Sequence, residues 1–459
     1  MAALLASSVS IIHEVFGFTD NVPAHRATTK IKTKERLSVC ICGGGNGAHI
    51  LAGLAASRPG VESRVLTLYA DEAERWTKAM ESGTFKIEIK GGGMSGEDVE
   101  VNVEPFRVSK DPQYVVPGAQ IIILCVPAFA HKQYFDAMAP YVGEQSTIIG
   151  LPGANGFEFQ LRGILKERSD LCTVMVFESL PWACRIKKFG TSVELLATKA
   201  VMDGAIHRPR KPSAFHHNHL ASFQYMLGDH PQLKIKGHLL GITLTAPNSV
   251  LHPIIMYGQW VNWDGKPQNK APLFYTGVTL ETGDLMGSVS DEVLAVAKSI
   301  MDQVPGVNLN NVKHIYDWLN VTYDEIGDRS TLTTCLRTNK GYQGLTHPCI
   351  KTDDGQFLPN FKFRYMTEDI TFGLAVIKGI ADIACVPTPS LDKVVYWAQK
   401  TLGKEFLVDG KLTGKDVKET RAPQAYGLVT LEAILKEDVD ITDPGGRRVS
   451  QVIHHPVKF

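Results

Sequence analysis

The chain of 459 residues lacks an excess of either charge. Lys and Arg total 48, Asp and Glu also total 48, and the formal net charge is therefore zero. A nucleic-acid-binding protein normally carries a basic excess, so we expect no nucleic-acid partner. Hydrophobic residues make up 44% of the chain and charged residues 21%. These values are close to globular averages, and they exclude a chain that is disordered throughout.

Cysteine is scarce, with eight residues and no CxxC pair. That number is too small for a disulfide scaffold, and the missing pair leaves little support for a thiolate zinc site. Several cysteines lie in apolar runs, as Cys125 does in IIILCVP, which favours buried free thiols and a cytoplasmic protein. The HHNH cluster at 216–219 is interpreted as a loop, so we expect no metal. We also find no uncharged apolar run near the ~18 residues of a membrane span, and we expect no membrane association.

Length alone favours about three domains, but the patterns along the chain fit two domains with two tails. Residues 1–36 begin with apolar and small residues and end in the basic run TTKIKTKER. We expect a disordered extension there, and an organellar presequence remains open. Residues 436–459 combine turn signals with mixed charge and are expected to form a tail.

Residues 37–238 alternate short apolar strands with helical patterns, which is typical of an α/β fold. Strands are expected at 37–42, 64–69, 119–127, 146–153 and 172–181, and a hairpin around the glycine-rich turn at 91–93. This order predicts a Rossmann-type, doubly wound parallel sheet. Long helical patterns such as SDEVLAVAKSIMDQV dominate residues 239–435 and predict a mainly α-helical second domain.

The segment GGGNGA at 43–48 fits the pattern G-x-G-x-x-A between a strand and a helix. Glycines permit a tight turn and close approach of the backbone to a pyrophosphate, and the helix N-terminus offers N–H donors and a positive dipole end. We therefore predict that this turn binds NAD. The predicted contacts are Gly43, Gly44, Gly45, Asn46, Gly47 and Ala48.

Two further groups are candidates for the cofactor site. An acidic residue is expected at the end of the second strand to bind the ribose hydroxyls, and Asp71 is the nearest candidate, although it could equally cap the next helix. No Lys or Arg precedes Arg75 there, which favours NADH over NADPH. Pro127 and Phe129 follow the fourth strand and could form a wall at the nicotinamide end, or simply belong to a strand-ending turn.

Long strings of this sequence strongly resemble the opine dehydrogenases of invertebrates, of the octopine dehydrogenase type. They include VCICGGGNGAH, RVLTLYADEAERW, VPAFAH, FESLPWACRIK, HPIIMYGQW, APLFYTG and RYMTEDI. The resemblance implies a Rossmann domain and a helical domain with the active site in the cleft between them. It also implies a reaction in which an amino acid and pyruvate condense to an imine that NADH reduces to an opine. That reaction regenerates NAD⁺ in anaerobic glycolysis, and we expect a monomer.

A lone histidine at the start of an apolar helix would ordinarily be structural, but His252 matches the family's catalytic histidine. Its imidazole suits proton transfer because its unperturbed pKa is near 6.5. The resemblance also assigns Asp369 as the partner that orients His252, and Arg364 as a group that binds a substrate carboxylate. A bidentate guanidinium suits that role. The alternative for both is a surface ion pair.

The resemblance further places Glu178, Ser179, Cys184 and Trp318 at the substrates. For Glu178 a helix-capping role remains open, and for Trp318 a role in core packing.

Three positions depart from the octopine-type pattern. Ala154 replaces a glutamine, and Ala246 and Asn248 replace a methionine and a tyrosine. These changes put arginine in doubt as the substrate and leave alanine, glycine, taurine and β-alanine open. Two other functions also stay open: a non-catalytic NAD(H)-binding regulator, and a hydroxy-acid dehydrogenase of the same architecture.

Overall fold

The computed structural model describes residues 36–435 apart from 82, 93–95 and 208–217, together with the strand pair β15 (Asp440–Thr442) and β16 (Arg448–Ser450). The predictions for residues 1–35, for most of the tail and for His216 and His217 lie outside these residues. Chain contacts divide the protein into two compact units. Among the described residues, the sheet unit holds those up to Pro152 and those within Ile164–Ile235, and the helical unit holds Gly153–Gly163 and those from Lys236 onward.

This division differs from the sequence-based boundary after residue 238 in two respects: the helical unit begins three residues earlier, at Lys236, and it includes an earlier segment. Gly153–Gly163 falls in the helical unit, although its place among the strands suggested the Rossmann domain. The reason is visible in its hydrogen bonds. Gly156 N–H donates to Thr243 Oγ1 at 3.2 Å, and Asn155 Nδ2 donates to Ser249 Oγ at 3.3 Å.

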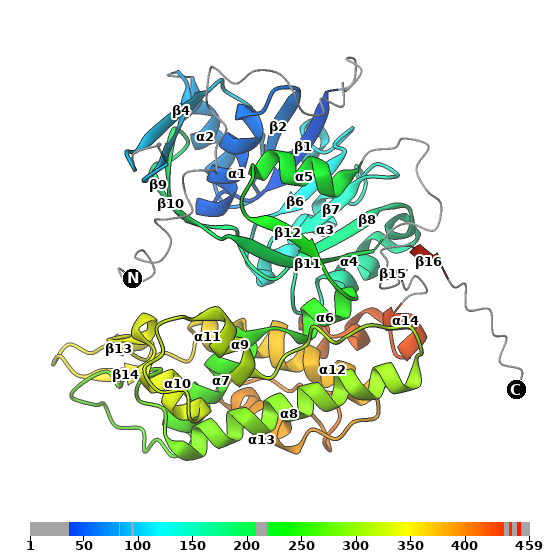
Figure 1. Ribbon diagram of the computed structural model, residues 1–459. Helices are drawn as coiled ribbons and strands as arrows, with labels where there is room; N and C mark the ends of the chain where they lie inside the picture. Colours follow the sequence, from blue (N-terminus) through cyan, green and yellow to red (C-terminus); the bar gives the residue numbers. More distant parts are fainter. Residues whose placement is uncertain are drawn as a thin grey trace, which may run out of the picture. The chain divides into compact units, whose positions relative to one another are not determined.

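The sheet unit is built on an eight-stranded sheet with the order β12-β11-β8-β7-β6-β1-β2-β5 (Figure 1). The six strands from β8 to β5 run parallel, and β11 runs antiparallel to β8. This confirms the Rossmann-type fold. The strands are β1 (Leu37–Cys42), β2 (Val61–Leu66), β5 (Arg107–Ser109), β6 (Ile121–Leu124), β7 (Thr147–Gly150), β8 (Thr173–Phe177), β11 (Val201–His207) and β12 (Gln232–Ile235).

The central strands are buried on both faces, which explains their continuous apolar sequences. All four residues of β6 and all four of β7 are buried. The second strand was predicted at 64–69 but spans Val61–Leu66, because it pairs in register with β1 from Leu37 to Cys42.

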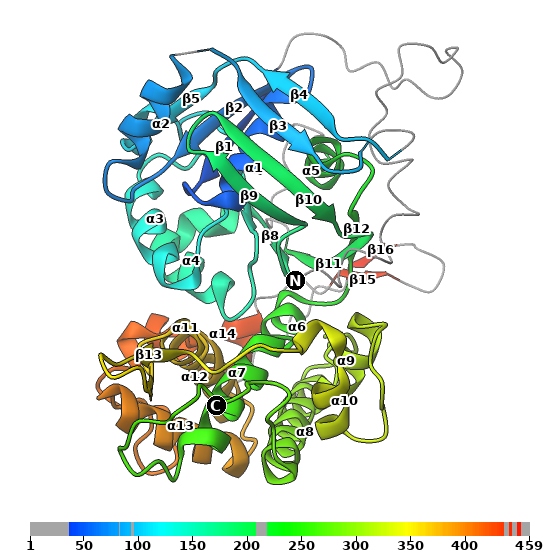
Figure 2. The same cartoon turned by 90° about the vertical axis from the view of Figure 1, so that its left-hand side faces the viewer.

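A second sheet of four strands, in the order β4-β3-β10-β9, packs on helix α1 (Asn46–Ser57) of the same unit (Figure 2). The hairpin of β3 (Phe85–Ile89) and β4 (Val99–Val103) was predicted. The strands β9 (Trp182–Lys188) and β10 (Ser192–Thr198) were missed, because only one of their faces is apolar. Gly53 permits the close packing, since a Cβ there would lie 2.8 Å from the Phe85 ring.

The other helices of the sheet unit connect its strands, and one of them packs against α1. Helix α5 contacts α1 and β12, and α2 contacts β5. Their bounds are α2 (Glu72–Met80), α3 (His131–Met138) and α5 (His219–Leu227), and α4 (Phe157–Leu165) starts in the helical unit.

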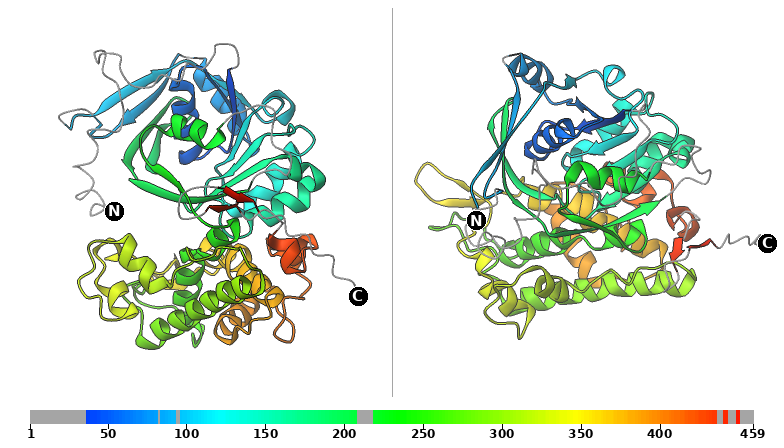
Figure 3. Two further views of the ribbon diagram at one scale, coloured as in Figure 1. Left: turned by 45° about the vertical axis from the view of Figure 1, so that its right-hand side comes forward. Right: turned by 45° about the horizontal axis from the view of Figure 1, so that its top comes forward.

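The helical unit is organised around α8 (Leu280–Gln303), which contacts α6, α7, α9, α10, α12 and α13 (Figures 1 and 3). This confirms the predicted helical second domain. Its other elements are α6 (Leu239–Leu244), α7 (Pro247–Trp260), α9 (Ile315–Thr322), α10 (Leu332–Thr338), α11 (Arg364–Thr367), α12 (Ala375–Ile383), α13 (Pro389–Leu402), α14 (Leu431–Leu435) and the strand pair β13 (Cys349–Lys351) and β14 (Phe357–Pro359).

One stretch, Leu239–Trp260, is long and apolar enough to span a membrane by length and composition. This corrects the expectation that no such run exists, because its 22 residues hold no Lys, Arg, Asp or Glu. The stretch comprises α6 and α7, which are separate helices, and 83% of the scored window is buried within the protein. Burial of this kind is typical of a core helix.

A buried ion network fixes α12 against α13. Lys378 Nζ lies 3.2 Å from Asp382 Oδ1 and 2.9 Å from Asp392 Oδ1, and it also donates to Thr388 Oγ1. Asp382 in turn accepts from the backbone N–H of Leu412. Because the lysine is buried with both carboxylates, removing it would leave uncompensated charge in the core. The network thereby holds α12, which continues directly from the segment that carries Asp369.

Candidate active site

The predicted dinucleotide turn connects β1 to α1 in the sheet unit. Gly43 has φ +130°, and a Cβ there would lie 2.8 Å from the carbonyl oxygen of Cys125, so only glycine fits. Gly45 occupies the N-cap position of α1, where a Cβ would meet nothing within 4 Å. The backbone at Gly45 is therefore open to a ligand, while the backbone at Gly43 is closely packed. Asn46, Gly47 and Ala48 are the first three residues of α1, and Ala48 is fully buried.

Two side chains of α1 hold this turn in place. Asn46 Oδ1 accepts from Ile186 N–H at 2.9 Å. His49 Nδ1 lies 3.1 Å from the Gly45 carbonyl oxygen, and its Nε2 accepts from Gly190 N–H at 3.1 Å. Burial lowers the pKa of His49 to about 3, so the ring is neutral and its Nδ1–H donates to Gly45. The sequence reading missed this residue, although it directly follows the glycine pattern.

The acidic group against the turn is Glu72 rather than Asp71. Asp71 is exposed, makes no capping hydrogen bond and pairs with Arg75 at 3.0 Å. Glu72 Oε2 accepts from Thr67 Oγ1 at 2.6 Å, and a Cβ on Gly44 would overlap this carboxylate. Thr67 directly follows β2, where ribose-binding groups usually lie. Glu72 is thus the better-placed candidate, and it was missed because it lies one residue inside a helix.

Aromatic side chains follow the strands on both sides of β1. Phe129 lies in the short helix η4 (Ala128–Ala130) after β6 and is 65% exposed, and Tyr69 lies after β2 and is 73% exposed. Pro127 precedes η4 as its N-cap residue. Because β6, β1 and β2 are parallel neighbours, these loops share one sheet edge with the glycine turn. Exposed aromatic surface at such an edge is available to a ligand.

The segment after β8 places Glu178 and Ser179 at the same edge of the sheet. Lys199 Nζ donates to Ser179 Oγ at 2.6 Å, and the charges of Lys199 and Glu178 interact. The carboxylate of Glu178 therefore lies in the electrostatic field of Lys199, a residue that was not predicted from the sequence. Cys184 lies apart from this group in the apolar core, where burial raises the pKa of its thiol to about 11.

The helical unit brings His252 and Asp369 together. His252 lies on α7 and Asp369 at the end of the short α11, 117 residues further along the chain. His252 Nδ1 is 2.8 Å from Asp369 Oδ2, and the two residues are 5% and 3% exposed. A carboxylate can only accept, so Nδ1–H donates and the lone pair of the neutral ring lies on Nε2. This is the arrangement of a general base oriented by a carboxylate.

Two local features bring α7 close to Asp369. Ile370–Leu374, immediately after Asp369, forms a π-helical turn, a rare geometry that is frequent at functional sites. Within it, a Cβ on Gly373 would overlap the side chain of Ser249. Ser249 lies one turn before His252 on α7, so the absence of a side chain at Gly373 allows the two helices to approach where the pair forms.

Aromatic residues surround the imidazole. The Tyr365 ring stacks on His252 at 3.8 Å between centroids, and the hydroxyl of Tyr275 is 2.9 Å from His252 Nε2. Tyr275 itself stacks on Tyr342 at 3.8 Å. Neither Tyr275 nor Tyr365 was singled out from the sequence, although both lie within strings that carry the family resemblance.

Arg364 and Trp318 lie in the same unit but do not contact His252. The Arg364 side chain is 58% exposed and its Nε lies 3.3 Å from Glu368. The alternative of a surface ion pair between Arg364 and Asp369 does not hold, because Asp369 is buried and only the arginine is exposed. Trp318 on α9 is partly buried and packs edge-on against Tyr323, which in turn packs on Tyr342 beside Tyr275.

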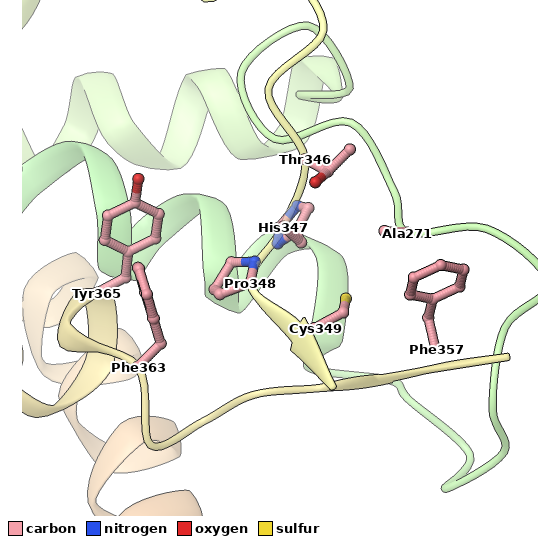
Figure 4. A pocket seen from close by; sticks show the side chains of 8 residues that line it. All are labelled: Ala271, Thr346, His347, Pro348, Cys349, Phe357, Phe363 and Tyr365. Carbon is pink, nitrogen blue, oxygen red and sulfur yellow. The ribbon is translucent and has the colours of Figure 1, made fainter. Parts of the chain in front are cut away.

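A pocket of about 300 Å³ adjoins Tyr365. Tyr365 contributes to both environments, since it lines the pocket and stacks on His252. Figure 4 shows Tyr365 and Phe363 on one side of the pocket and Phe357 on the other, with His347 and Cys349 between them. Trp260 Nε1 donates to His347 Nδ1 at 3.1 Å, and burial lowers the pKa of His347 to about 3. This imidazole is therefore neutral. No cluster of metal-binding side chains occurs among the residues that the structure describes.

Comparison with known proteins places this geometry in a family. Residues 235–402 match the model of the α-helical domain of NAD/NADP octopine/nopaline dehydrogenases. The chain is 51% identical over 397 residues to a tauropine dehydrogenase of Arabella iricolor, covering 86% of this chain and 99% of that protein. A solved octopine dehydrogenase with NADH and L-arginine superposes with a TM-score of 0.82 at 46% identity, covering 91% of this chain and all of that one. Its complex with NADH and pyruvate gives a TM-score of 0.79 at 45% identity, with the same coverage.

A Rossmann-type unit with a dinucleotide turn, combined with a helical unit that carries a buried His–Asp pair, defines an NAD-dependent oxidoreductase. The identities over nearly the whole chain are more specific. The chain belongs to the opine dehydrogenase family, whose members are oxidoreductases that act on CH–NH donors.

Gly45→Ala tests the dinucleotide turn. The added methyl meets nothing within 4 Å in the protein, so thermal stability should change little. The methyl would instead occupy the space through which a pyrophosphate approaches the backbone, and we expect NADH affinity to fall at least tenfold in a fluorescence titration. Gly287→Ala on α8 is the matched control because its Cβ also meets nothing within 4 Å. Equal NADH affinities in the two variants would contradict the assignment.

Gly373→Ala tests the approach of the two helices. Its methyl would overlap the side chain of Ser249, so α7 must shift and the His252–Asp369 hydrogen bond should lengthen. We expect the turnover number to fall by about 10²-fold, as for misplacement of a catalytic group by ~1 Å, while NADH affinity stays unchanged. Adding Ser249→Gly should restore part of the turnover. If Gly373→Ala keeps full activity, the close approach has no role in positioning the pair.

Proposed function

We propose that this enzyme catalyses the reductive condensation of an amino acid with pyruvate, using NADH, to give a secondary-amine dicarboxylate. The observation that carries the proposal is the buried His252–Asp369 pair, with Nδ1 and Oδ2 2.8 Å apart. Support also comes from the turn at residues 43–48, whose open backbone at Gly45 fits a dinucleotide. The named relatives act as opine dehydrogenases, and one solved relative binds NADH with pyruvate.

The chemistry requires protons to be moved at a defined atom. The amino acid must lose a proton before its nitrogen attacks the oxo group, and the resulting carbinolamine must lose water to form the imine. His252 Nε2 is the atom that we assign to these transfers, because Nδ1 is committed to Asp369. As Nε2 gains a proton, the Asp369 carboxylate stabilises the imidazolium. When bound, NADH supplies the hydride that reduces the imine carbon.

The cofactor would be held by the sheet unit. The N–H groups at the start of α1 face the open side of the turn at Gly45, and Glu72 with Thr67 would bind the ribose hydroxyls. A carboxylate at that position repels a 2′-phosphate, which supports a preference for NADH over NADPH. Asp71 is a weaker candidate for this contact because it is engaged by Arg75.

Arg364 is our candidate for the substrate carboxylate. Its guanidinium is largely exposed, and among the described residues its ion-pair partner is Glu368, 3.3 Å from Nε, so its other N–H groups can donate to both oxygens of a carboxylate. It lies five residues before Asp369, on the element that positions the proton-transferring pair.

The identity of the amino acid depends on Ala154, Ala246 and Asn248. The structure brings their segments together: Arg421 donates to the carbonyl of Ala154, the adjacent Asn155 bonds to the first turn of α7, and Ala246 caps that helix. Two small side chains at this location favour a small amino acid, with alanine and glycine ahead of taurine, β-alanine and arginine. The interaction between the charges of Glu178 and Lys199 also weakens the case for a cationic substrate.

The proposal also covers the location and the oligomeric state of the enzyme. We place the enzyme in the cytoplasm as a monomer that regenerates NAD⁺ during anaerobic glycolysis. All eight cysteines are free thiols, which supports a reducing compartment.

The test is to follow the absorbance of NADH with pyruvate alone and then with each of the five amino acids. We expect oxidation only when both substrates are present. His252→Gln should lower the turnover number by about 10²–10⁴-fold, the usual contribution of a general acid or base. Its NADH affinity should stay unchanged, because the cofactor site lies in the other unit. His314→Gln, which alters a partly exposed helix-capping histidine of the same unit, is the control.

The two alternative functions, a hydroxy-acid dehydrogenase and a non-catalytic NAD(H)-binding regulator, would each give a different result in this assay. Oxidation with pyruvate alone would identify a hydroxy-acid dehydrogenase. NADH binding without turnover for any pair would identify a regulator. Near-normal turnover of His252→Gln would remove the assigned role of the histidine.

A further inference from the structure

Both ring nitrogens of His252 are occupied by side chains of the helical unit itself. Asp369 Oδ2 lies 2.8 Å from Nδ1, and the Tyr275 hydroxyl lies 2.9 Å from Nε2. Since Nδ1–H donates to the carboxylate, Nε2 of the neutral ring has only a lone pair. The phenol must therefore donate to it. The hydroxyl of Tyr275 therefore bonds to Nε2, the atom to which the proposed function assigns proton transfer.

Tyr275 is held firmly in this position. Its ring lies parallel to Tyr342, with 3.8 Å between centroids and 10° between planes, and packs edge-on against Phe274 at 4.8 Å. Burial raises the pKa of Tyr275 well above its usual value, and the nearby Tyr365, Tyr323 and Asp369 raise it further. The hydroxyl consequently stays protonated and can either donate or accept a hydrogen bond.

The remaining neighbours of the imidazole offer its edge no comparable partner. The Tyr365 ring covers one face at 3.8 Å, and Phe274 lies 5.9 Å away at an angle of 56°. Aromatic faces pack against a ring but do not replace an in-plane hydrogen bond. Leaving a buried polar atom unpaired is unfavourable, so a ring without Tyr275 would gain by rotating or by admitting water.

We propose that Tyr275 is a positioning residue whose hydroxyl holds Nε2 of His252 in both protonation states, and so keeps Nδ1 facing Asp369. In the neutral state the phenol O–H donates to Nε2. Before Nε2 takes a proton from substrate, the phenol hydrogen turns away about the C–O bond and frees the single lone pair of Nε2, where the new N–H bond forms as the bond between that proton and the substrate breaks. The phenol oxygen can then accept from Nε2–H, and no bond of the tyrosine breaks. The link to catalysis rests on the function proposed above.

The titratable side chains around the ring differ in the atom that they contact. Asp369 contacts Nδ1, and the hydroxyl of Tyr275 contacts Nε2. Tyr365 stacks on the face of the ring, and Tyr342 stacks on Tyr275. Without the hydroxyl of Tyr275, no other side chain of the described residues bonds to Nε2, so the ring can rotate away from Asp369 or exchange its tautomer.

Tyr275→Phe removes only this hydroxyl and keeps the stacking surface. We expect NMR of protein with ¹⁵N-labelled histidine to show a single Nδ1–H tautomer of His252 in the wild type and a mixture of tautomers in the variant. The turnover number should fall about 10–100-fold, with KM for NADH unchanged because the cofactor is bound by the other unit. Tyr257→Phe on α7, five residues after His252, is the matched control.

The outcomes separate this inference from the proposed function. An unchanged His252 tautomer and an unchanged turnover number in Tyr275→Phe, with an active wild-type enzyme, would overturn the inference and leave the function standing. A mixture of tautomers in the variant of a protein that oxidises no NADH with any amino acid would support the positioning of the ring and overturn the function. The wild-type spectrum provides a second test that needs no variant. Nitrogen shifts of an Nδ1–H tautomer support the proposal, and those of an Nε2–H tautomer contradict it.

Discussion

The hydrogen bond between His252 and Asp369 is the interaction on which the account of this enzyme depends. It joins two helices that are far apart in the sequence, and it forms where both residues are almost fully buried. In such surroundings a carboxylate that accepts from the imidazole fixes its tautomer and stabilises its charged form. The π-helical turn after Asp369 and the missing side chain at Gly373 serve this contact, and the Lys378 network holds the helix that continues from it.

The two units supply different parts of the chemistry, because a parallel sheet and a set of packed helices position different kinds of groups. A parallel sheet collects its loops at one edge, so glycine backbone, the carboxylate of Glu72 and exposed aromatic rings can surround a dinucleotide there. A helical unit can instead enclose a titratable side chain within aromatic packing and hold it by two hydrogen bonds. The opine dehydrogenase reaction needs both, because a hydride and protons must be delivered separately to one substrate pair.

Much of this structure could be predicted from the sequence. The apolar strands and the glycine pattern indicated the Rossmann-type unit, because a strand buried on both faces has a distinctive composition. The strands β9 and β10 were missed because half of their side chains face outward, and Gly153–Gly163 was misplaced because its hydrogen bonds depend on distant residues. The roles of His252 and Asp369 were predicted from the family resemblance. The contact between them could not be predicted from the sequence pattern, because no local pattern encodes a contact across 117 positions. Glu72 and Tyr275 were missed for the same reason: each becomes visible only when its neighbour in space is known.

The most direct test that this enzyme joins pyruvate to an amino acid is to identify the product. The enzyme would be incubated with pyruvate, alanine or glycine, and NADH deuterated at the transferable position, and the product would be examined by mass spectrometry. The account predicts one deuterium on the carbon that was the oxo carbon of pyruvate, now bonded to the nitrogen of the amino acid. Deuterium found only in lactate, with no secondary amine formed from any amino acid, would contradict it.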